Sequence, residues 1–326
     1  MKKALIYTAA TLGISWVVAL AFHLITGYTG PEMGLEAQLS YQKFASVFMF
    51  LPTIVALILQ AFGGELTLRR PHSTRIKIVP KKNSLLKFRP RWSWLVAIAT
   101  VPVVVALSII FSGLFNEVVS MRDGTIALMQ AQGVGALPEE VLAELNAVPS
   151  WVMLFSTVVS GLLAGVTINA LFAFGEEYGW RFYMVDALRG KKFIVAALAI
   201  GAVWGIWHAP LILMGHNYPE ARVAGVFMMV VFCILGGIVE LYFVLKSGTF
   251  WPAIFFHGTI NALAGLGVIM IPGGSRLLTG MTGLAGFMAI AVVIALIYLY
   301  DRHISHENIL GSTLGASLAR HEQEQE

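Results

Sequence analysis

The stretch FGEEYGWR, residues 174 to 181, places two carboxylates and one guanidinium in an apolar part of the sequence. Glu177 and Arg181 are four residues apart, in the order that favours an ion pair along a helix. Glu176 is turned about 100° away from Glu177 on the same helix. We therefore expect Arg181 to hold Glu177 while Glu176 points elsewhere, with its carboxylate available for chemistry.

Three further polar side chains interrupt apolar runs later in the chain. His208 lies in WGIWHAP, one helical turn after Trp204. His257 and Asn261 lie in FFHGTIN, four residues apart and therefore on one helix face. A lone histidine in a helix bundle is usually a packing residue. Two histidines and an asparagine, in a chain with a buried glutamate, instead indicate a functional site.

Two kinds of chemistry fit these groups. Glu176, His208 and His257 could bind a catalytic zinc ion, since two histidines and a glutamate form a known ligand set. The helix-borne H-E-x-x-H pair is missing, however, and asparagine is a poor zinc ligand. Alternatively, a glutamate and a histidine activate one water without a metal, while the second histidine and Asn261 donate hydrogen bonds to the developing oxyanion. This second scheme uses all four groups.

Other reactive side chains in the apolar runs carry weaker signals. Cys233 is the single cysteine, which excludes a disulfide within the chain and favours a small packed hydrophobe. Ser156 and Ser160 lie outside any recognisable nucleophile motif. Glu240, in GGIVELYF, lines a cavity or accepts a hydrogen bond from a site histidine, or else is a buried, protonated carboxyl bonded to a neighbouring helix.

Composition decides which elements must position these residues. The chain has 326 residues, of which 57% are hydrophobic and 12% charged, and its mean hydropathy is +0.77. Such values are typical of a polytopic membrane protein. Because a helix needs about 20 apolar residues to cross a bilayer, we expect an all-α fold with about eight transmembrane helices, at 4–26, 44–62, 93–115, 152–175, 192–214, 222–246, 250–272 and 282–300.

The charges of FGEEYGWR are costly at this depth. A charged side chain in mid-membrane costs roughly 2.5 to 3.5 kcal/mol. If the basic cluster at residues 189–192 marks the membrane interface, Glu176 lies about 19 Å from that interface along the helix. This distance favours a buried or cavity-facing site over a simple charged helix end.

Basic residues predict the orientation. The loop after the second span contains no acid and nine basic residues: Arg69, Arg70, Arg75, Lys77, Lys81, Lys82, Lys87, Arg89 and Arg91. It should be cytoplasmic, in contact with the lipid bilayer. Counting spans from it places both termini inside and the acidic loop at 116–150 outside. Beside two membrane spans these residues are an orientation signal, and we expect no nucleic-acid partner.

The domain organisation is simple. No internal repeat is visible, nor a pair of matching broken helices such as a transporter built from inverted halves has. All recognisable chemistry lies between residues 170 and 265. We expect a single membrane domain over residues 1–326 with a motif-bearing half at about 152–272. Residues 301–326 form a polar cytoplasmic tail that we expect to fray into solvent.

Three motifs carry a family resemblance. EEYGWR matches E-E-x-x-x-R, WGIWH resembles F-x-x-x-H and HGTIN matches H-x-x-x-N, in that order and on successive predicted helices. With these motifs the chain resembles the CPBP group of intramembrane proteases, also called the Abi or CAAX-protease group. The group includes the endoprotease that trims prenylated CAAX proteins.

The resemblance implies eight helices around a conical intramembrane cavity. Glu176 and His208 would activate water there, and His257 and Asn261 would form the oxyanion hole. No cofactor is implied by this glutamate-type mechanism; the group was long regarded as metal-dependent, and zinc, if used, would be bound by Glu176, His208 and His257. By the resemblance, Glu177 and Arg181 would be supporting residues. We also expect Trp204 and Glu240 to support the site, although Glu240 belongs to none of the three motifs.

One residue departs from the family pattern. Trp204 stands where the second motif has phenylalanine, so the aromatic wall one turn from His208 is kept with a larger ring. We expect this change to affect substrate access rather than catalysis.

The expected function is hydrolysis of a peptide bond in a membrane-embedded or membrane-bound protein or peptide. A non-proteolytic immunity or scaffolding role and a proton-coupled transporter are the alternatives. Short loops and the absence of targeting signals indicate a multi-pass protein of a bacterial plasma membrane. Maturation of a peptide or turnover of a membrane protein fits that setting better than trimming of prenylated proteins. Neither the substrate nor the oligomeric state follows from the sequence.

Overall fold

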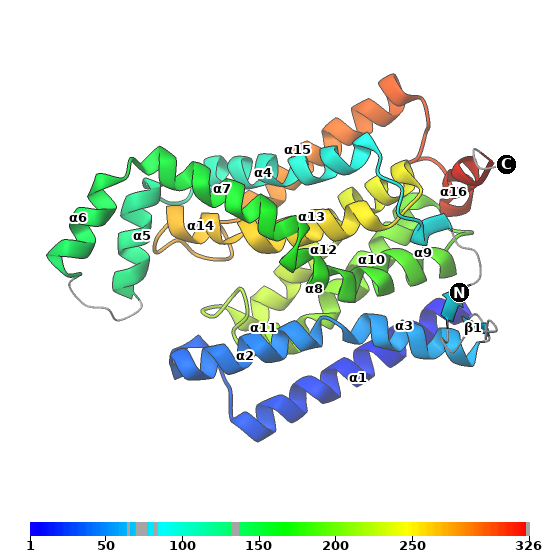
Figure 1. The fold of residues 1–326 in the computed structure, drawn as a ribbon, viewed down its shortest axis with the longest axis horizontal. Coiled ribbons are helices and arrows are strands. Elements are labelled where there is room, and N and C mark those ends of the chain that lie inside the picture. The colour runs from blue at the N-terminus through cyan, green and yellow to red at the C-terminus, as the bar shows by residue number, and fades with distance from the viewer. Residues whose placement is uncertain (64–65, 70–76, 81–83, 132–136, 324–326) are drawn as a thin grey trace.

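Helices make up nearly all of the fold (Figure 1). The computed structural model describes residues 1–63, 66–69, 77–80, 84–131 and 137–323. Four of the nine basic residues in the predicted orientation loop lie outside the described residues: Arg70, Arg75, Lys81 and Lys82. The helices are α1 (Lys2–Thr26), α2 (Leu35–Phe48), α3 (Leu51–Phe62), α4 (Trp92–Ser112), α5 (Met121–Met129), α6 (Glu139–Ala147), α7 (Ser150–Val166), α8 (Ile168–Glu177), α9 (Met184–Ala187), α10 (Phe193–Trp207), α11 (Ala209–Leu213), α12 (Arg222–Ser247), α13 (Trp251–Leu263), α14 (Gly265–Met270), α15 (Leu284–Tyr300) and α16 (Leu314–Gln323).

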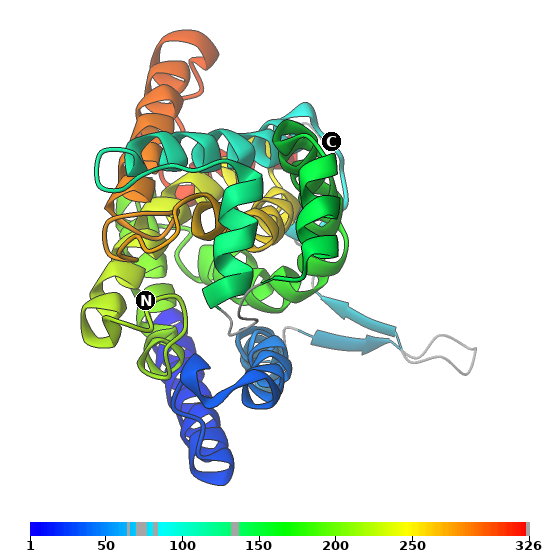
Figure 2. The same cartoon turned by 90° about the vertical axis from the view of Figure 1, so that its left-hand side faces the viewer.

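Shorter elements complete the described chain. Strands β1 (Leu66–Arg69) and β2 (Lys77–Pro80) pair antiparallel. They project sideways from the helical bundle (Figure 2). The α-helices are accompanied by 3-10 helices at Pro31–Met33 and Ser84–Leu86 and by π-helical segments at Tyr178–Tyr183 and Asp301–Ser305.

The fold class agrees with the composition. Seven helical segments of the described chain are long and apolar enough to cross a membrane, and the bent pair of α6 and α7 forms an eighth candidate. Many large apolar side chains on the outer faces are exposed, as lipid contact requires; examples are Val17, Leu24, Leu95, Ile110, Phe227 and Leu299. The chain is an all-α polytopic membrane protein.

Several predicted spans differ in detail from the structure, and the second and fourth show this most clearly. The second begins earlier than predicted, at Leu35, and is divided before Pro52, which lies in the first turn of α3 and lacks the N–H that would continue the preceding helix. The fourth is not one helix, because the chain leaves helical geometry at Thr167. A Cβ at Gly165 would lie 2.6 Å from the Cα of Thr259, so α13 packs directly against this break.

The two ends of the bundle differ in what they carry. Both termini, β1, α9 and α16 lie at one end, on the right of Figure 1. The helices α5 and α6 lie at the opposite end. A chain that crosses a membrane an even number of times has both termini on the same side, as here. We refer to these two ends as the terminal end and the distal end.

Residues 301–323 of the C-terminal segment do not fray, contrary to the expectation from its polar composition, and residues 324–326 lie outside the described residues. Helix α16 packs on the terminal end with Leu314 and Leu318 fully buried. Nε2 of His321 lies 2.8 Å from the carbonyl oxygen of Leu245, to which it can donate. The few apolar residues of this segment recur on one helix face, which lets a polar sequence dock.

Close packing of α10 on α12 fixes the positions of the second motif. A Cβ at Gly205 would lie 2.4 Å from the Cα of Val230, and one at Gly201 would lie 2.6 Å from the Cα of Ile234. Only glycine allows the two backbones to approach so closely, as in other small-xxx-small helix pairs in membranes. This contact brings Trp204 into the interior of the bundle.

Candidate active site

The first motif lies on a helix whose geometry changes within it. Glu176 and Glu177 end α8, and the next six residues, Tyr178–Tyr183, form a π-helical segment that contains Arg181. All three charged side chains are buried, with exposed fractions of 2%, 0% and 1% respectively. Such local π-segments are common at functional sites. The motif therefore lies inside the bundle and not at a solvated helix end.

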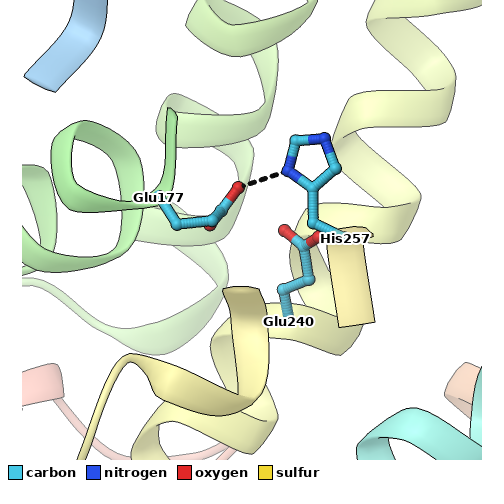
Figure 3. A group of neighbouring side chains, drawn as sticks. All are labelled: Glu177, Glu240 and His257. Carbon is cyan, nitrogen blue, oxygen red and sulfur yellow. Dashed lines mark hydrogen bonds and ion pairs between the residues drawn. The ribbon is translucent and has the colours of Figure 1, made fainter. Parts of the chain in front are cut away.

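Glu177 links the first motif to the third. Its Oε1 accepts hydrogen bonds from Nη1 of Arg181, at 3.2 Å, and from Nδ1 of His257, at 2.8 Å. Figure 3 shows the Glu177 carboxylate pointing toward the His257 ring. The ion pair that the four-residue spacing predicts is present, and the same carboxylate also orients a histidine 80 residues away in sequence.

Glu240 completes this buried cluster. Its Oε2 forms an ion pair with Nη2 of Arg181, so one guanidinium bridges two carboxylates from α8 and α12. Glu240 is fully buried and does not line the cavity described below. Of the two sequence-based alternatives, the structure agrees with a buried carboxyl bonded to a neighbouring helical segment, and the partner is the Arg181 guanidinium. No hydrogen bond to a site histidine is present among the described residues.

Glu176 points away from this cluster, toward α10. Its Oε2 accepts a hydrogen bond from Nε1 of Trp204 at 2.6 Å. The Trp204 ring also lies under the Arg181 guanidinium, with 4.2 Å between Cζ and the ring centroid, and meets the His257 ring edge-on at 5.3 Å. Trp204 therefore contacts residues of the first and third motifs at once.

His208 occupies the junction between α10 and α11. Its Nδ1 lies 2.9 Å from the carbonyl oxygen of Trp204. A carbonyl can only accept, so Nδ1 carries the hydrogen and, in the neutral ring, Nε2 is the free acceptor. The local break follows from Pro210, which lies in the first turn of α11.

One cavity gathers the four sequence-predicted catalytic residues. It has a volume of about 780 Å³, and Glu176, His208, His257 and Asn261 all line it, together with Trp204. His257 and Glu176 are buried at its inner end, whereas Asn261 is exposed one turn further along α13. The structure thus brings together side chains from three separate helical segments.

A metal ion fits this donor set poorly. Among the described residues, one group of three has ligand atoms within 4.8 Å of one another, namely Glu177, Glu240 and His257. Both carboxylates of that group already pair with the cationic Arg181. The zinc ligands considered from the sequence, Glu176, His208 and His257, do not form such a group.

Trp204 makes a contact that the sequence did not predict. An aromatic ring at this position was expected to shape access, but the indole N–H is a hydrogen-bond donor and meets the carboxylate of Glu176. The signal was present in the residue type, because a buried indole N–H usually finds an acceptor. What the sequence lacked was the partner, 28 residues away on another helix.

The fold and this site define an all-α polytopic membrane protein with a cavity that reaches into the bundle and is lined in part by acidic and histidine side chains. Residues 150–263 match the family model described as Type II CAAX prenyl endopeptidase Rce1-like. CAAX prenyl protease 2 of Methanococcus maripaludis is 35% identical over 65 residues, which cover 20% of this chain and 23% of that relative. No match to a solved structure was found. The resemblance to the CPBP group is confirmed over the segment that carries the motifs.

Proposed function

We propose that this protein is an intramembrane endopeptidase that hydrolyses a peptide bond in a membrane-embedded or membrane-bound protein or peptide. The observation that carries the proposal is the single cavity lined by Glu176, His208, His257 and Asn261. The Rce1-like match over residues 150–263 supports the same reaction class. We propose that the protein is located in the plasma membrane of a bacterial cell.

In this proposal, Glu176 and His208 activate the attacking water. Both carry a free acceptor toward the cavity: Glu176 retains an oxygen beyond the one bonded to Trp204, and His208 retains Nε2. One of these groups removes a proton from water as its oxygen attacks the carbonyl carbon of the substrate. The attack forms a carbon–oxygen bond and moves the carbonyl π electrons onto the carbonyl oxygen.

His257 and Asn261 stabilise the oxyanion by donating hydrogen bonds to it. Nδ1 of His257 donates to Glu177, so a second donation from Nε2 requires the ring to carry both protons. Glu177 and Glu240, when ionised, bring two negative charges against the one positive charge of Arg181, and an imidazolium balances the remainder. Asn261 lies one turn away on the same helix, with an amide N–H₂ to donate.

Collapse of the tetrahedral intermediate completes the reaction. The oxyanion re-forms the carbonyl, the carbon–nitrogen bond breaks, and the leaving nitrogen takes the proton that the general base removed from water. The products are a carboxylic acid and an amine, and no metal ion or cofactor enters the balance. Each group used is a side chain of this protein.

A comparison of protein N-termini tests the proposal. Membranes would be prepared from cells expressing the wild type or Glu176→Gln at matched levels, and new N-termini would be identified by mass spectrometry. We expect a set of termini that appears only with the wild type. Gln keeps the size of Glu176 and the acceptor for Trp204, so the comparison isolates the carboxylate.

Identical sets of termini in the two membranes would contradict the proposal. Asn261→Ala provides an independent variant, because this side chain is exposed and its removal should not disturb the core. Loss of cleavage in both variants, with the proteins equally abundant, supports the proposed roles. Retained function without the carboxylate would instead favour the immunity or scaffolding role.

A further inference from the structure

The loops that line the cavity show at which end of the bundle it opens. Its inner end is formed by Glu176 and His257, and its lining continues to segments that follow α1 and α11 and precede α15. Those segments contribute Tyr28, Gly215 and Thr282. Because α1 starts at the N-terminus and ends beside Tyr28, this rim lies at the distal end of the bundle (Figure 1).

Charge differs strongly between the two ends. Besides Arg69, Lys77, Lys87, Arg89 and Arg91 in the described part of the chain between α3 and α4, the terminal end carries Lys2, Lys3, Arg189, Lys191, Lys192, Lys246, Arg302 and Arg320, against the acids Asp186, Asp301, Glu307 and Glu322. The distal end carries an excess of acids, in Glu32, Glu36, Glu117, Asp123, Glu139, Glu140, Glu144 and Glu220, against the basic residues Arg122, Arg222 and Arg276. An excess of Lys and Arg in short loops marks the cytoplasmic side of a membrane protein.

We propose that the catalytic cavity opens to the extracytoplasmic face and receives the scissile segment of its substrate from that side. This inference rests on the proposed function and adds the direction of entry. The charge asymmetry sets the terminal end in the cytoplasm, and the rim residues set the opening at the other end. The four proposed catalytic residues then lie deeper in the bundle than an opening that faces away from the cytoplasm.

The lining limits the chemistry of the segment that enters. No Lys or Arg is among the described residues that line the cavity. Gln38 and Gln42 of α2 face it, as do Asn217 and Asn261 on the other side, and these amides suit the N–H and C=O groups of an extended peptide. The one cation that the proposed function places on this lining is protonated His257, which is assigned to the oxyanion, so a free C-terminal carboxylate would find no separate cation among the described lining residues. The lining therefore favours an internal bond in an uncharged segment.

Thiol labelling tests the direction of entry. In a Cys233→Ala background, Glu36→Cys would report on the distal end and Arg302→Cys on the terminal end, since both side chains are exposed. Gln42→Cys would report on the cavity lining. Spheroplasts of a bacterial host would be treated with a membrane-impermeant maleimide, before and after permeabilisation.

We expect labelling at residues 36 and 42 in intact spheroplasts and at residue 302 only after permeabilisation. The maleimide adduct at residue 42 should also reduce cleavage at least tenfold relative to the same variant before labelling, because it fills the entry route. Labelling at residue 302 but not at residues 36 and 42 in intact spheroplasts would overturn the proposal, as would full cleavage with residue 42 completely modified.

The two proposals fail separately in this experiment. Labelling does not depend on catalysis, so the direction of the opening is decided even if no substrate is cleaved. Absence of cleavage in the unlabelled parent, with the outward labelling pattern present, would contradict the endopeptidase and leave the outward opening established. Size-exclusion profiles of the detergent-solubilised variants would exclude misfolding as the cause of either result.

Discussion

Nε1 of Trp204 donates a hydrogen bond of 2.6 Å to Oε2 of Glu176, which joins the second motif to the carboxylate of the first. The family pattern has phenylalanine at this position, and phenylalanine has no N–H to donate. The departure therefore acts on the proposed general base itself, beyond any effect of ring size on access. We propose that Trp204 is a positioning residue in this chain.

Replacement of Trp204 by phenylalanine should lower kcat by roughly 10- to 100-fold. A hydrogen bond to a charged group contributes about 1.5 to 3 kcal/mol, and its loss lets the carboxylate turn from the position that activates water. Steady-state kinetics on a substrate identified from the N-terminus comparison would measure the change. Trp251→Phe is the matched control, since this indole lies on α13 but outside the cavity lining. An unchanged kcat in Trp204→Phe would show that the bond does not matter.

Removal of either carboxylate from Arg181 should destabilise the fold. Glu177→Ala and Glu240→Ala each leave a buried guanidinium with one partner fewer. Breaking a buried pair in this way costs about 3 to 5 kcal/mol. The unfolding temperature in detergent and the abundance of the protein in the membrane should both fall in each variant. Glu177→Ala should also lose activity, because His257 loses its orienting partner. Glu32→Ala is the control, as it breaks an exposed pair with Arg222 and should change neither measurement.

A methyl group at Gly205 should disturb the site through helix packing. The added Cβ would lie 2.4 Å from the Cα of Val230, so α10 must move away from α12. We expect Gly205→Ala to cost about 1 to 3 kcal/mol in stability and to lower activity, because the shift displaces Trp204. Gly236→Ala on α12 is the matched control, with no atom within 4 Å of its added Cβ. Equal unfolding temperatures for the two variants would argue against this packing role.

Stability should depend on pH through His216, which lies in the loop between α11 and α12. Burial beside the Tyr41 ring lowers the pKa of His216 to about 4. The unfolded chain, in which the pKa of histidine is about 6.5, then binds more protons than the folded chain between pH 4 and 6.5. Stability is therefore complete above about pH 6.5 and declines as the pH falls toward 4. Unfolding temperatures of the wild type and His216→Gln across this range would check the sign: the decline should be smaller in the variant.

Local spacing was sufficient to predict the polar site in outline. The four-residue separation of Glu177 and Arg181 predicted their ion pair, because helix periodicity alone places them side by side. The same periodicity separated Glu176 from that pair, and the structure has Glu176 on the cavity and Glu177 behind it. The apolar runs predicted the positions of the membrane helices for the same reason, since bilayer thickness fixes their length.

The C-terminal segment is a case in which average composition gave a wrong prediction. The polar average over residues 301–326 predicted fraying, yet Leu314 and Leu318 recur at four-residue spacing and dock α16 on the bundle. The break at Thr167 was equally hidden, because nothing in the apolar run around it marks the close approach of α13. In both cases the deciding contacts come from residues distant in sequence.

The sequence by itself determined the fold class, the approximate positions of most membrane spans and the identity of the residues that are candidates for chemistry. Tertiary structure alone decided which of those residues meet: Trp204 with Glu176, His257 with Glu177, and Glu240 with Arg181. It also decided that the cavity lining reaches the distal end. The physical reason is that helix periodicity and hydropathy act within one segment, whereas these contacts depend on how closely separate helices pack.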